Sequence, residues 1–133
     1  MLVTIEKVLS LKQLPLFKTV SNMALSDLMA VSEEKTIKKA ETLISPTEQN
    51  HSVYFLLSGS MEISDNDHKE IIQAPAFIGL DSVFLQASAG KEITTKQTSV
   101  VLQTQHDKLY RMMALHPSLA TAILHEMSFM IRK

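Results

Sequence analysis

Residues 36–63 decide the fold of this chain, and they read TIKKAETLISPTEQNHSVYFLLSGSMEI. A short strand is followed by a polar turn and then by the apolar run Val53–Leu57. A Ser58-Gly59 corner leads into a second strand with alternating apolar positions. Short apolar runs bounded by turn residues are typical of strands that pack in a sandwich or barrel.

The composition is that of one soluble globular domain. The chain has 133 residues, of which 45% are hydrophobic and 20% charged, so it can bury a core and does not look disordered. A net charge of −1 predicts no strong attraction to nucleic acid or to anionic membranes. The absence of cysteine excludes disulfides and thiolate metal sites. No apolar run is long enough to span a membrane, and no signal peptide precedes the domain, so we expect a cytoplasmic protein.

The periodicity of apolar residues changes twice along the chain. Helical spacing predicts helices within residues 4–34, the first over 4–13 and the second from a Ser21 cap to about Glu34. Short strands separated by turns occupy 36–106, with a hairpin whose tip is 65–67. Helical spacing returns over 107–133, where Ser118 is the expected cap of the final helix.

Several segments, taken in order, resemble the cyclic nucleotide-binding domain family. The resemblance is to the effector domains of catabolite activator protein-like regulators. The similar segments are Leu14–Phe17, Thr36–Ile63, Phe77-Ile78-Gly79 and Lys108–Pro117. The resemblance implies one domain over 1–133. It is mainly β, an eight-stranded jelly-roll β-barrel with N-terminal helices and a C-terminal helix. Within it we expect inward-facing side chains at Leu43, Val53, Phe55, Leu57 and Ile63.

The resemblance also implies where a ligand would bind. In the family a Gly-Glu pair opens a short helix whose backbone N–H groups face the nucleotide phosphate, and an Arg about ten residues later neutralises it. Here Gly79 is present, Leu80 replaces the Glu, and Lys91 is the only cation between Gln86 and Thr95. The candidate ligand-binding residues are Gly79, Leu80, Asp81, Ser82, Lys91, Thr94 and Thr95.

The glycines of the family pattern are also replaced. Ala40 and Thr47 stand where the family usually has Gly, and the segment 73–76 contains none. We therefore predict that cyclic AMP and cyclic GMP bind weakly or not at all. No other cofactor is expected.

Other classes of site are not indicated by the sequence. The five histidines lack the clustered spacing of a metal site, so neither a metal nor a cupin-like enzyme is predicted. No Ser-His-Asp or Cys-His arrangement, P-loop or dinucleotide motif is present, and we expect no catalysis and no catalytic residues.

Three hypotheses follow. The domain has a degenerate site and acts through protein contacts, or it is a sensor that uses Lys91 and the Gly79 turn for a small anionic nucleotide or another anion. Alternatively it is the sensor part of a larger transcription regulator, channel or transporter.

The last helix suggests a partner surface. Its apolar stripe continues to the end of the chain, and a homodimer would cover it. The candidate interface residues are Ile123, Met127, Met130 and Ile131. Within this chain we expect no contact with nucleic acid or membrane.

Overall fold

The structure, a computed structural model, describes residues 4–45, 51–65, 67–79 and 91–131. Helices stand at both ends of this chain: α1 (Thr4–Lys12), the 3-10 helix η1 (Pro15–Phe17), α2 (Asn22–Ala30), α4 (His106–Leu115) and α5 (Pro117–Ile131). The strands between them are β1 (Glu33–Ile37), β2 (Thr42–Ile44), β3 (Ser52–Ser58), β4 (Ser60–Asp65), β5 (His68–Gln73), β6 (Ala76–Ile78), β7 (Lys91–Thr95) and β8 (Ser99–Gln105).

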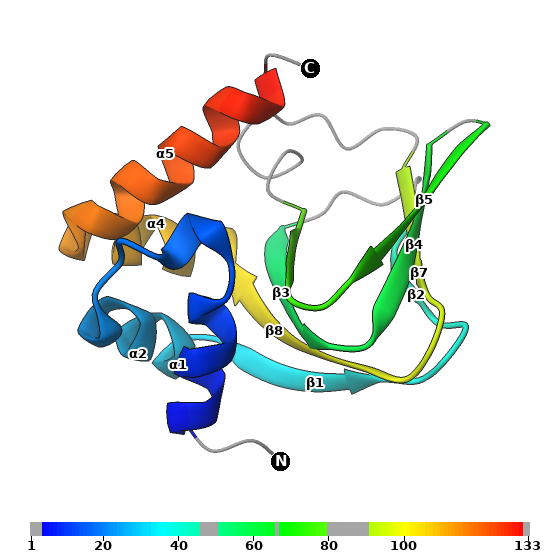
Figure 1. Ribbon diagram of the computed structural model, residues 1–133, viewed down its shortest axis with the longest axis horizontal. Coiled ribbons are helices and arrows are strands. Elements are labelled where there is room, and N and C mark those ends of the chain that lie inside the picture. Colours follow the sequence, from blue (N-terminus) through cyan, green and yellow to red (C-terminus); the bar gives the residue numbers. More distant parts are fainter. Residues whose placement is uncertain (1–3, 46–50, 66, 80–90, 132–133) are drawn as a thin grey trace.

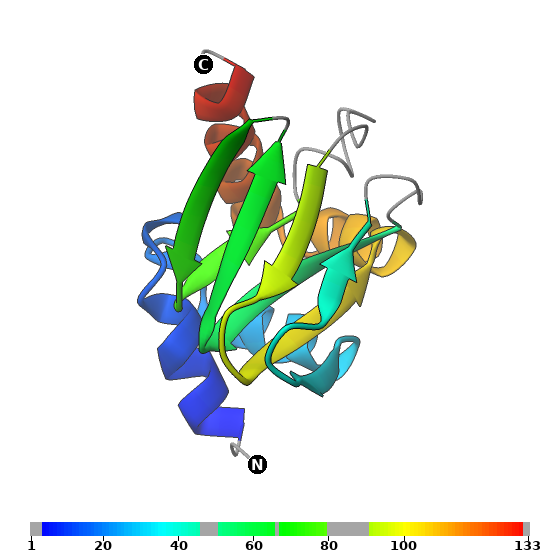
Figure 2. The same cartoon turned by 90° about the vertical axis from the view of Figure 1, so that its right-hand side faces the viewer.

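These eight strands form two antiparallel sheets of four. One sheet has the order β1-β8-β3-β6 and the other the order β2-β7-β4-β5. In Figure 1 the two sheets meet at an angle and the helices cover the outer face of the first sheet. Figure 2 shows the second sheet face on, with its strands side by side. The predicted jelly roll with flanking helices is confirmed.

β3 lies at the centre of this arrangement and is buried on both faces. Val53, Phe55 and Leu57 belong to the cluster shared with the helices, whereas Tyr54 and Leu56 belong to the cluster between the two sheets. The prediction that Val53, Phe55 and Leu57 face the barrel interior was therefore wrong. Side chains alternate between the two faces of the strand, which separates the two sets. Because helices cover the outer face, its side chains are as apolar as those of the inner face.

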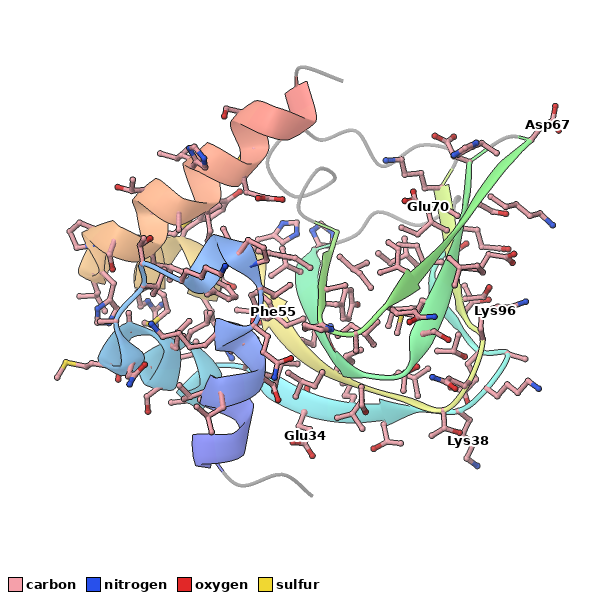
Figure 3. The ribbon with its side chains drawn as sticks, in the orientation of Figure 1. Glu34, Lys38, Phe55, Asp67, Glu70 and Lys96 are labelled. Carbon is pink, nitrogen blue, oxygen red and sulfur yellow. The ribbon has the colours of Figure 1, made fainter. Side chains whose placement is uncertain are left out.

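Three phenylalanine rings pack together between the helices and the first sheet. Phe55 on β3 lies 4.5 Å from Phe77 on β6 and 5.5 Å from Phe17 in η1, measured between ring centroids. Both distances lie in the range of about 4.5–7 Å over which aromatic rings attract one another. Figure 3 shows Phe55 where the first sheet meets the helices.

Among the described residues, no helix is both long and apolar enough to cross a membrane.

The second helix ends earlier than its sequence pattern predicts. Ser21 caps α2 as expected, since its Oγ accepts a hydrogen bond from the Ala24 N–H at 3.1 Å. The helix stops at Ala30, and residues 33–37 pair with β8 instead of extending the helix to Glu34. Ser32 stabilises this break, because its hydroxyl contacts the Leu28 carbonyl and the Thr104 hydroxyl, each at 2.6 Å.

The start of the final helix also differs from the prediction. α5 begins at Pro117, so Ser118 lies inside the first turn rather than at the cap. Proline suits the first helical position because its fixed φ matches the helix and its missing N–H would have had no partner there. The His116 carbonyl accepts from the N–H groups of Leu119 and Ala120.

The corner between β3 and β4 requires glycine. Gly59 has φ +101°, and a Cβ built there would lie 2.1 Å from the Ser99 Oγ and 2.7 Å from the Ser99 Cα. The second contact is with backbone, which cannot rotate away. This close approach lets the chain pass from the first sheet to the second.

Gly59→Ala should therefore lower the free energy of unfolding by about 3 kcal/mol or more, from backbone strain and overpacking together. Urea unfolding followed by circular dichroism measures the change. The control is Ser58→Ala, at the exposed neighbouring position, which should stay close to the unsubstituted protein. Equal stability of the two variants would contradict the close approach.

Ala40 is the described non-glycine residue with a positive φ, at +68°. It lies in the exposed turn between β1 and β2, where the resemblance implies a glycine. A left-handed conformation costs an L-residue roughly 1–2 kcal/mol because Cβ crowds the following carbonyl.

Ala40→Gly should raise the free energy of unfolding by about 0.5–1 kcal/mol, the relief of strain less the greater freedom of glycine in the unfolded chain. The same substitution at Ala120, inside α5, should instead lower it by about 1 kcal/mol. Thermal unfolding of both variants measures these changes in stability. Destabilisation by Ala40→Gly would show that the turn does not strain this residue.

Candidate functional site

The segment that carries the expected phosphate contacts begins directly after β6. Gly79 is described there with φ +89°, a conformation that favours glycine. Leu80, Asp81 and Ser82 lie outside the described residues. Their role in ligand binding therefore remains an expectation from the sequence.

Lys91 opens β7 at the interior side of the barrel. It stands directly opposite Asp65 of β4 in the antiparallel register. Two residues later Ile93 is buried in the cluster between the sheets, and side chains two apart share a face of a strand. Lys91 is half-buried, and its contact with an anion stays a prediction from the sequence.

Thr94 and Thr95 occupy opposite faces of the same strand. Thr94 pairs with Glu62 and Thr42 on the outer face, away from the barrel interior. Thr95 is 2% exposed, and its hydroxyl serves the turn between β1 and β2. It donates to the Lys38 carbonyl at 2.5 Å and accepts from the Glu41 N–H at 3.0 Å. Thr94 thus lies on the outer face and the Thr95 hydroxyl bonds to the β1–β2 turn, and the sequence predicted neither position.

A polar group inside the barrel was missed by the sequence argument. Gln103 of β8 donates from its amide to the Ser52 hydroxyl at 3.0 Å and to the Tyr54 hydroxyl at 3.4 Å. The Gln103 Oε1 is buried without a hydrogen-bond partner. Burial raises the pKa of the Tyr54 phenol above its ordinary value. These side chains provide hydrogen-bonding groups at the end of the barrel where β3 begins.

Two histidines were also missed, at the junction of the barrel and the C-terminal helices. His51 and His106 have ring centroids 5.9 Å apart and line a cavity of about 320 Å³ with Ser52, Gln105 and Asp107. Burial and the nearby His51 lower the pKa of His106. The two residues are far apart in sequence, and only the pairing of β3 with β8 brings them together.

The apolar stripe on α5 is divided between two environments. Leu119 and Ile123 are fully buried in the core of this chain, so Ile123 is not placed to contact a second copy. Met127 is half-buried and packs against the same core. The side chains of Met130 and Ile131 lie outside the described residues. Self-association through the end of α5 stays a prediction.

The fold agrees with what comparison of the sequence with known families shows. The pattern of the family described as "Cyclic nucleotide-binding domain" matches residues 34–116, which is more than half of the chain. The chain belongs to this family. No curated protein sequence matches it closely enough to add a relative.

Solved structures with the same fold come from several kinds of regulator. The sensor domain of the transcriptional regulator DNR from Pseudomonas aeruginosa superposes with a TM-score of 0.77 at 19% identity, over 95% of this chain and 94% of that one. A cyclic nucleotide-binding domain from Methylobacillus flagellatus gives 0.79 at 16%, over 97% and 76%. The regulatory domain of Toxoplasma gondii PKA, crystallised with cAMP, gives 0.79 at 11%, over 94% and 49%.

The different roles of the two threonines can be tested. Thr95→Val keeps the shape but leaves the Lys38 carbonyl and the Glu41 N–H without the hydroxyl, and should cost roughly 1–2 kcal/mol of stability. Thr94→Val on the outer face should stay within about 0.5 kcal/mol of the unsubstituted protein. Chemical unfolding of both variants gives the comparison, and equal losses would contradict the structural role of the Thr95 hydroxyl.

Proposed function

We propose that this domain is a non-catalytic regulatory module that binds cyclic nucleotides weakly or not at all and acts through protein contacts. Three things support the proposal: membership in the cyclic nucleotide-binding domain family, the residues at the phosphate-binding positions, and exposed apolar side chains on the C-terminal helices.

The position of Lys91 carries the argument about the ligand. It lies on the interior side of β7, where the resemblance implies an arginine that neutralises the phosphate. The chain has arginine only at positions 111 and 132, so no arginine precedes α4. Lysine supplies a point charge rather than the planar fork that binds two phosphate oxygens at once.

The energetic consequence is large enough to matter. A hydrogen bond to a charged group contributes roughly 1.5–3 kcal/mol, and two are lost if Leu80 and Lys91 replace the family's Glu and Arg. At about 1.4 kcal/mol per decade this lowers affinity by about a hundredfold to ten-thousandfold. A ligand that binds related domains in the micromolar range would then bind here in the millimolar range.

Exposed apolar residues on the helices support the role of protein contacts. Leu115 at the end of α4 is 63% exposed and Leu124 on α5 is 58% exposed. Large aliphatic side chains gain free energy when a partner removes them from water. A parent-protein domain or a separate protein would provide that surface, as the output part of a transcription regulator, channel or transporter would.

The second candidate is a working sensor for a nucleotide or another small anion. It is favoured by the conformation of Gly79 and by the interior placement of Lys91, two of the residues that the resemblance implies for a phosphate site. The two candidates differ in the affinity they predict.

Calorimetric titration with cyclic AMP and cyclic GMP tests the first candidate. We expect no measurable heat, or a dissociation constant near the millimolar range. The double variant Leu80→Glu with Lys91→Arg should restore binding by about a hundredfold or more, because it returns the two charged hydrogen bonds. The control is Lys96→Arg, which makes the same lysine-to-arginine change at an exposed position beyond β7 and should have no effect.

A dissociation constant in the low micromolar range for the unsubstituted protein would overturn this proposal in favour of the sensor. A double variant that folds but still fails to bind would show that weak binding has another cause than these two positions.

A further inference from the structure

The register of β3 against β8 brings two histidines together at the start of α4. Ser52 is the partner of Gln105 in the ladder, and the next hydrogen bond joins the His106 N–H to the His51 carbonyl at 2.9 Å. His51 directly precedes β3, and His106 is the first residue of α4. This backbone hydrogen bond therefore closes the joint between the barrel and the C-terminal helices.

Protonation of the His106 ring is unfavourable while this joint is closed. The Nε2 atom of the ring is buried and has no hydrogen-bond partner among the described residues. A protonated imidazole carries an N–H on both nitrogens, so charging the ring would bury an unpaired N–H together with a positive charge. The closed joint therefore favours the neutral ring, whichever nitrogen holds its proton.

The second histidine acts in the same direction. The ring centroids of His51 and His106 lie 5.9 Å apart, so a positive charge on one ring repels a positive charge on the other. Burial and the nearby His51 together lower the pKa of His106. A hydrogen bond with the Ser52 backbone and the negative charge of Asp107 favour the protonated ring, but they are weaker.

Other ionisable groups lie on the elements that pack against α4, namely β8, α2 and α5. β8 has no ionisable side chain, and the one carboxylate of α2, Asp27, contacts His116 beyond the other end of α4. α5 carries the exposed His125 and the half-buried Glu126. Both are unchanged in the variants of the test, so a difference between those variants does not come from them.

The direction of the pH dependence follows from these contacts. When the joint opens, His106 reaches water and its pKa returns to the ordinary value of 6.5. The closed joint holds the pKa below that value, so the open form binds a proton that the closed form does not as pH falls through 6.5. The closed joint is thus favoured at neutral pH. Acid shifts the equilibrium toward opening by at most about tenfold per pH unit, the limit for one proton.

We propose that the joint between the barrel and α4 is an acid-sensitive switch, in which a proton on His106 releases the start of α4 from the start of β3. α4 and α5 carry the exposed side chains Leu115 and Leu124. Release of α4 therefore changes how these apolar side chains are presented to a partner.

Hydrogen exchange of the His106 amide, followed by NMR, tests the proposal because this N–H makes the closing bond to His51. After correction for the intrinsic exchange rate, its protection should fall several-fold between about pH 7 and about pH 5, and more than that of the β4 amides. In His106→Gln, whose side chain stays neutral, this extra fall should disappear. The control His68→Gln removes an exposed histidine of β5 and should keep it.

An NMR titration of the imidazole signals in the unsubstituted protein does not depend on whether a variant folds. His106 should titrate at a lower pH than the exposed His68, and His51→Gln should raise its midpoint because a nearby positive charge is removed. The proposal is overturned if His106 titrates at or above pH 6.5. It is also overturned if the His106 amide loses no more protection than the β4 amides, or if His106→Gln loses as much as the control.

Discussion

The rest of the structure depends on the burial of β3 on both faces. Its outward side chains, with Phe55 at their centre, form the surface on which α1 and η1 pack. Its inward side chains, Tyr54 and Leu56, form the wall of the barrel. A strand in this position stabilises two cores at once, so the helical layer and the second sheet cannot form independently of it. Each apolar side chain buried there contributes roughly 1.5–3 kcal/mol.

A few contacts outside the cores position β7 from the end of the strand opposite Lys91. Gly59 lets the chain cross from β3 to β4 against Ser99, and Thr95 ties β7 to the turn that contains Ala40. Together these contacts fix the position of β7, of which Lys91 is the first residue. These contacts involve backbone atoms and a buried hydroxyl rather than the groups that would touch a nucleotide. The fold at this end therefore does not depend on the residues that would touch a ligand.

The helical layer joins the two ends of the chain beside the barrel. His116, between α4 and α5, contacts the Asp27 carboxylate of α2 at 2.9 Å, and α5 packs on η1. The N-terminal and C-terminal helices therefore form one layer. Such a layer suits a module whose output is a movement or a contact of its helices.

The sequence by itself determined the class of fold and most of its elements. The apolar run at Val53–Leu57, the Ser58-Gly59 corner and the 65–67 turn are local signals, and each reports a conformation that neighbouring residues impose. The same holds for the Ser21 cap. The positions of the expected ligand site come from the resemblance alone and stay a prediction.

Only the tertiary structure decided which residues meet. It placed Val53, Phe55 and Leu57 toward the helices, turned Thr95 into the β1–β2 turn and buried Ile123 in the core. It also joined His51 to His106, which are distant in sequence and show no metal-like spacing. The physical reason is the same in each case. Strand alternation gives every residue a face, but whether that face meets solvent, a second sheet or a helix depends on register and packing between distant segments.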